Sequence, residues 1–114
     1  VPTAMLRDPS VSEEQLGRAV RSMGRKGASD GIAEDDRGRV FAGDYEHNAI
    51  RVLDRGQWST VVSDPRISFP NEGAVGPDGC FYFPGSQIHR SARFGDGTSQ
   101  VQLPFEVMKI RVSP

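Results

Sequence analysis

The feature that most constrains this fold is a repeated segment of strand and turn residues. One copy, DGIAEDDRGRVFAGD, begins at Asp30, and the other, EGAVGPDGCFYFPGS, begins at Glu72. With one deletion in the turn, the Asp-Gly start of the first copy aligns with the Glu-Gly start of the second, and Phe41 aligns with Tyr82. The offset of about 41 residues is typical of a four-stranded β-propeller blade. The repeat predicts two similar β-units in tandem.

Short β-rich runs alternate with turn residues from Ser29 onward, and 13 Gly and 8 Pro supply the turns. Strands at this spacing predict an all-β fold of about two propeller blades. The expected strands are Gly31–Ala33, Val40–Ala42, Ala49–Leu53, Trp58–Val62, Gly73–Val75, Cys80–Phe83, Gln87–Ser91 and Phe105–Val112.

One short helix is expected before the first strand. Ser12 is a suitable N-cap, and Gln15 stands at the capping-box position. An apolar stripe then predicts a helix from Glu13 to Met23, with glycines beyond it as stop signals. Residues Val1 to Met5 are expected to be extended.

Composition excludes several classes of protein. The net charge is −1 and both signs are mixed along the chain, so neither nucleic acid nor an anionic membrane surface is an expected partner. No apolar run approaches the roughly 20 residues of a membrane-spanning helix, and no signal peptide is recognised. Cys80 is the only cysteine, which rules out an internal disulfide.

Two blades alone would leave two apolar faces uncovered. We therefore expect either further blades in a longer protein or self-association of copies. The predicted division is 1–28 as the end of a preceding blade plus a helical connection, 29–66 as one blade, and 67–114 as the last blade.

The chain resembles the C-terminal part of the major royal jelly/Yellow family, of the bacterial dopachrome-tautomerase-related type. The resemblance is carried by SDGIAEDDRGRVFAGDYEHNAIRVLD, FPNEGAVGPDGCFYF, SQIHR and PFEVMKIRV, and by the lead-in LRDPSVSEEQLGRAVRSMGRKGASDG. It implies a six-bladed propeller related to the gluconolactonase/regucalcin group, with the helix in an inter-blade connection. It also implies a secreted or periplasmic location.

The same resemblance implies a ligand site on the central channel. Some members of the family bind biogenic amines, and the lactonase relatives hold one divalent cation such as calcium on the axis. Asp30, in its Asp-Gly pair, resembles one of those metal ligands, and carboxylate oxygens suit hard cations. A turn-capping role for Asp30 is the alternative.

Four further residues are candidates for ligand binding. Asn71 and Glu72 occupy the repeat-equivalent place in the second unit, although Pro-Asn is also an ordinary turn pair. Ser86 and Gln87 lie where Yellow-type sequences carry an Asn before the Gln; the serine here weakens the carry-over of amine binding. A plain strand position is the alternative for both.

The remaining candidates have simpler interpretations. His47 and His89 lack neighbours at metal-ligand spacing, so they are expected to be ordinary surface or packed histidines. The aromatic side chains and Cys80 are expected to fill space between blades.

Three functions follow as hypotheses. The first is binding of a small polar or aromatic molecule at the channel. The second is metal-dependent lactone hydrolysis with Asp30 as a ligand. The third is a structural or interaction role without catalysis; whether the protein is an enzyme stays open.

Overall fold

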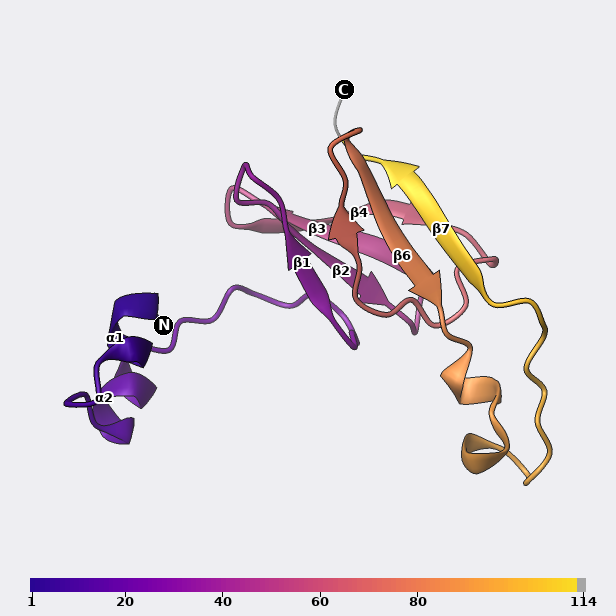
Figure 1. Cartoon of the computed structure of the whole chain (residues 1–114), viewed down its shortest axis with the longest axis horizontal. Helices are drawn as coiled ribbons and strands as arrows, with labels where there is room; N and C mark the ends of the chain where they lie inside the picture. The colour runs from indigo at the N-terminus through magenta and orange to yellow at the C-terminus, as the bar shows by residue number, and fades with distance from the viewer. Residues whose placement is uncertain (113–114) are drawn as a thin grey trace.

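The computed structural model describes residues 1–112, and most of its regular structure is antiparallel β-sheet (Figure 1). This confirms the all-β prediction. Sheet A has the strand order β1-β2-β3-β4, and sheet B has the order β5-β6-β7. The bounds are β1 (Ile32–Glu34), β2 (Val40–Asp44), β3 (Ala49–Asp54), β4 (Gln57–Ser63), β5 (Ala74–Val75), β6 (Cys80–Gly85) and β7 (Glu106–Arg111).

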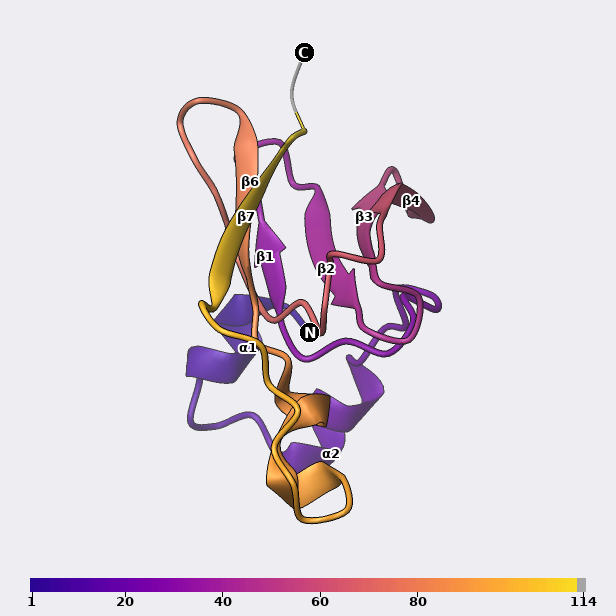
Figure 2. The same ribbon diagram turned by 90° about the vertical axis from the view of Figure 1, so that its right-hand side faces the viewer.

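The two sheets form a wedge. They are closest at β1 and β5 and diverge toward β4 and β7 (Figure 2). Aromatic side chains fill the space between them: the ring centroids of Phe41 and Phe81 lie 5.3 Å apart, and those of Phe81 and Phe83 lie 5.6 Å apart. Ile50 and Ile67 complete this buried cluster. Burial of these large apolar side chains is the main stabilising contribution to the pairing of the sheets.

The turns of the two hairpins correspond residue for residue. Asp35 N donates to Arg39 O at 3.0 Å, and Gly76 N donates to Cys80 O at 2.8 Å, so the two turns have the same length. The deletion expected in the turn is therefore wrong. Phe41 still corresponds to Tyr82, but Asp30 now corresponds to Asn71 instead of Glu72.

This correspondence shows that unlike faces of the two hairpins meet. Phe41 points into the space between the sheets, whereas its counterpart Tyr82 is flanked by two core residues of β6. Because successive side chains of a strand alternate between faces, Tyr82 points away from sheet A. Sheet B therefore packs on sheet A as a repeated unit, with its other face turned outward.

The N-terminal region contains two short helices where one was expected. These are α1 (Thr3–Arg7) and α2 (Glu13–Arg18), which lie to one side of the sheets (Figure 1). The prediction of extended backbone over Val1 to Met5 is wrong. The capping box is confirmed: Gln15 N donates to the Ser12 hydroxyl at 3.3 Å, and Ser12 N donates to Gln15 Oε1 at 2.8 Å.

Helix α2 ends five residues before the expected end at Met23. Val20 is 65% exposed and Met23 is 60% exposed, so no buried contact of these side chains would stabilise a longer helix. Instead the Met23 carbonyl accepts a hydrogen bond of 2.8 Å from Trp58 Nε1 of β4. This tertiary contact ties the segment that follows α2 to the outer strand of sheet A.

The strand expected at Gln87–Ser91 is also absent. Gln87 has a left-handed backbone with φ of 51°, which cannot continue a strand. Two 3-10 helices follow, η1 (Ile88–Arg90) and η2 (Ala92–Phe94), before the chain returns to β7. Sheets A and B lie within the predicted ranges 29–66 and 67–114, of which residues 113 and 114 lie outside the described part of the chain.

Candidate functional site

The starts of β1 and β5 bring Asp30 and Glu72 to the same end of the wedge. A Cβ atom placed on Gly31 would lie 2.8 Å from the Cα of Glu72 and 3.0 Å from its amide nitrogen. Only glycine allows this close approach, because any side chain at residue 31 would overlap Glu72. We call the end defined by Asp30, Asn71, Glu72 and Ser86 the rim.

The carboxylates of Asp30 and Glu72 are both exposed. Over residues 1–112, neither has a hydrogen bond or an ion pair with the rest of the chain. Each of these carboxylates is therefore available to a cation or to a hydrogen-bond donor of a ligand.

Asn71 and Ser86 are joined directly. The Ser86 hydroxyl donates to Asn71 Oδ1 at 2.8 Å and also lies 3.2 Å from the Phe69 carbonyl. Backbone bonds from Asn71 N to Pro84 O and from Ser86 N to Phe69 O hold the two strands of this end together. Because Asn71 Oδ1 accepts the Ser86 hydroxyl, the orientation of the Asn71 side-chain amide is fixed, and its NH₂ group remains available as a donor.

Gln87 follows Ser86 in the sequence, but its side chain makes different contacts. Its side-chain nitrogen donates to Gln102 O at 2.8 Å, and its side-chain oxygen accepts from Gln102 N at 3.0 Å and Arg90 Nη1 at 3.2 Å. Gln87 is also buried. Gln87 therefore closes the loop over residues 88–102. The other three candidates, Asn71, Glu72 and Ser86, form the rim together with Asp30.

A stack of three aromatic rings lies beside the rim. Tyr45 and Phe69 are parallel with centroids 4.4 Å apart, and Phe69 and His89 are 5.7 Å apart. Phe69 has a φ of 55°, a left-handed backbone that a phenylalanine rarely adopts. His89 was expected in a strand, but η1 places it on this stack. The sequence contained no signal for the stack, because its rings come from three separate segments.

Asp44 is a second residue that sequence reasoning missed. Its carboxylate is buried, and both oxygens lie 3.0 Å from His47 Nδ1, with Arg51 Nη1 at 3.6 Å. A buried carboxylate needs such partners to offset its lost hydration. Its position at the end of β2, before a turn, was the available signal. His47 is thereby a partner of Asp44, although its ring is largely exposed as expected.

The sequence predicts a cation such as calcium at Asp30, and the rim carries two exposed carboxylates, Asp30 and Glu72. Carboxylate and amide oxygens suit calcium, which takes six to eight oxygen ligands. Within the described residues, no group of three or more His, Cys, Asp or Glu side chains is arranged to hold a metal ion. The rim donors thus suit calcium in kind, but the described residues do not by themselves form a metal site.

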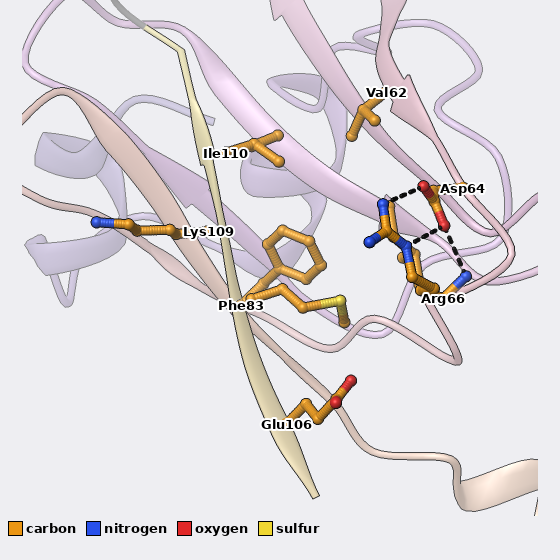
Figure 3. Close-up of a pocket in the computed structure, with 9 residues that line it drawn as sticks. Val62, Asp64, Arg66, Phe83, Glu106, Lys109 and Ile110 are labelled. Carbon is orange, nitrogen blue, oxygen red and sulfur yellow. Dashed lines mark hydrogen bonds and ion pairs between the residues drawn. The ribbon is translucent and has the colours of Figure 1, made fainter.

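A separate hollow of about 290 Å³ opens at the mouth of the wedge (Figure 3). Val62 of β4 faces Ile110 of β7 across it, and Met108 of β7 also lines it. At one end Asp64 accepts two hydrogen bonds from the Arg66 guanidinium, of 2.9 and 2.7 Å.

The side-chain hydrogen bond from Arg66, followed by its backbone bond, lowers the pKa of Asp64 from 3.8 to about 2. Since folding lowers this pKa, the ionised group contributes stability above pH 3.8, and the contribution is lost as the pH falls through about 2. We expect Arg66→Gln to move the Asp64 pKa back toward 3.8, measured by NMR titration. Arg93→Gln, which removes an arginine lying over Phe94, should leave it unchanged. An Asp64 pKa that stays near 2 in Arg66→Gln would contradict this explanation.

Comparison with known proteins identifies no family for this chain. No protein-family model matches the chain, and no curated protein matches it significantly. Over the described residues, no helix has the length and apolar character needed to cross a membrane.

Proposed function

We propose that this chain contributes two adjacent blades to a six-bladed propeller of the Yellow type and binds a small polar or aromatic molecule at the rim. The observation that carries the proposal is that two exposed carboxylates without partners among residues 1–112, Asp30 and Glu72, stand just before β1 and β5, two strands that lie side by side. In a propeller, these strand starts surround the shared axis, so their side chains are available to a ligand in the channel.

Two features of the packing support the propeller. The sheets diverge from β1 and β5 toward their outer strands, as blades do around an axis (Figure 2). The faces that meet are also unlike, with Phe41 packed on Phe81 and its counterpart Tyr82 turned outward. A two-fold sandwich of equivalent sheets would bring equivalent residues together, whereas repeated units that stack in one direction bring together unlike faces.

The rim residues suit a ligand that carries hydrogen-bond donors or a positive charge. Asp30 and Glu72 are acceptors, and the Asn71–Ser86 pair adds an oriented amide. The neighbouring stack of Tyr45, Phe69 and His89 supplies aromatic surface beside these polar groups. A cationic or catechol-like molecule satisfies both features, since cations are attracted to ring faces and to carboxylates.

The test is titration of the chain with dopamine, with and without calcium, followed by NMR chemical shifts of the rim amides. We expect saturable shifts at residues 30, 71, 72 and 86. The double variant Asp30→Asn with Glu72→Gln should weaken binding about tenfold or more, because it removes both charges. Asp36→Asn is the matched control, since it removes an exposed carboxylate from the β1–β2 turn at the other end of the strand.

Equal binding by the double variant and the wild type would contradict the rim as the site and favour the structural role. Calcium-dependent opening of a lactone such as gluconolactone in the same samples, lost in Asp30→Asn, would instead favour the hydrolase hypothesis.

A further inference from the structure

Another hollow, of about 520 Å³, lies between sheet A and the segment that leads from α2 to β1. Arg21 and Ser22 line it from this segment, and Arg55 and Gly56 line it from the turn between β3 and β4. None of the described residues that line it is acidic. Because β3 runs in the same direction as β1, the end of β3 lies at the opposite end of sheet A from the rim, so this hollow is a separate place.

The two arginines of this hollow have no counter-ion. Over residues 1–112, neither Arg21 nor Arg55 forms an ion pair, whereas Arg39 and Arg66 each pair with an aspartate at 2.7 Å. Residues 19–29, which include Arg21, contain three basic residues and no acidic one. Positive charge that is gathered in one hollow without a counter-ion favours an anion as its occupant.

The hollow also has neutral hydrogen-bond donors. Arg55 and Gly56 have φ values of 49° and 80°, the left-handed backbone of a tight hairpin turn. Along the described chain, the backbone N–H of neither residue has a hydrogen-bond acceptor. Ser22 Oγ accepts from Gly24 N at 3.3 Å, so its hydroxyl hydrogen remains free to donate. Free N–H and O–H groups beside guanidinium groups are the donors that phosphate oxygens accept.

Part of the wall is apolar and fixed in place. Leu53, which is only 5% exposed, and Met23 line the hollow beside the charged groups. The hydrogen bond of 2.8 Å from Trp58 Nε1 to the Met23 carbonyl ties this wall to sheet A. Hollows of about 300–1,000 Å³ hold small organic molecules, so there is room for an organic group as well as an anion.

We propose that this hollow binds the phosphate monoester of a small organic molecule. The guanidinium groups of Arg21 and Arg55 and the free N–H groups of the β3–β4 turn hold the phosphate, and the organic group lies against Leu53 and Met23. Arginine pairs with two phosphate oxygens at once, which favours phosphate over a spherical anion such as chloride. This binding does not depend on the function proposed for the rim.

The probe is phenyl phosphate, titrated into the full chain at pH 7, where a phosphate monoester carries a charge of about −1.5 to −2. Calorimetry should show saturable binding, and NMR should show amide shifts at residues 21–24 and 53–56. Inorganic phosphate should bind more weakly because it lacks the apolar group, and benzyl alcohol should not bind because it lacks the charge. Equal binding of phenyl phosphate and benzyl alcohol would overturn the role of the arginines.

The double variant Arg21→Gln with Arg55→Gln should weaken phenyl phosphate binding about tenfold or more. Both side chains are exposed, so the core stays intact. The matched control is Arg93→Gln with Lys109→Gln, which removes two positive charges from exposed residues outside the hollow and should bind as the wild type does. Absence of saturable binding, or shifts confined to other residues, would overturn the proposal. Equal weakening by the two double variants would also overturn it, since attraction to the net charge alone would then explain the binding.

Discussion

Replacing Phe81 with alanine is expected to lower the free energy of unfolding by about 3–5 kcal/mol. Phe81 is only 1% exposed and stacks on both Phe41 and Phe83, so its removal leaves a cavity between the two sheets. Small domains have a total stability of about 5–15 kcal/mol, so this single change removes a large share. Urea denaturation followed by circular dichroism measures the difference.

Phe94→Ala is the matched control for this prediction. Phe94 is 58% exposed in η2 and lies outside the buried cluster, so its replacement should change the unfolding free energy by less than about 0.5 kcal/mol. Equal destabilisation by both substitutions would show that the wedge between the sheets does not hold the fold together.

Replacing Gly31 with alanine is expected to lower the free energy of unfolding by about 1–3 kcal/mol and to separate Asp30 from Glu72. The added methyl group would overlap the Glu72 side chain and lie 2.8 Å from its backbone Cα. Relief of this overlap requires movement of the chain at one of the two strand starts, because a backbone atom cannot rotate away. The same substitution should therefore weaken dopamine binding at the rim.

Gly17→Ala provides the comparison for that change. A Cβ atom on Gly17 meets nothing within 4 Å, and the residue lies within α2, where alanine is favoured by about 0.5–1 kcal/mol. Thermal unfolding should rank the variants as Gly17→Ala at or above the wild type, with Gly31→Ala below both. Wild-type stability in Gly31→Ala would contradict the close contact between the strand starts.

Local patterns were sufficient to predict most elements. Alternating β-branched and aromatic residues between turn signals placed seven strands within one or two residues of their observed bounds, because each hairpin is determined by nearby residues. The capping box at Ser12 and Gln15 was predictable for the same reason. The sequence also located the two strand starts that carry Asp30, Asn71 and Glu72.

Tertiary contacts decided the remainder, because no local pattern records a distant partner. The end of α2 depends on Trp58, which is bonded to the Met23 carbonyl, and the course after β6 depends on Gln102, which pairs with Gln87. The aromatic stack unites three distant segments. The sequence by itself determined the hairpins and their order; the packing of Phe41 on Phe81 determined which faces meet, since burial of apolar surface acts between elements irrespective of their separation along the chain.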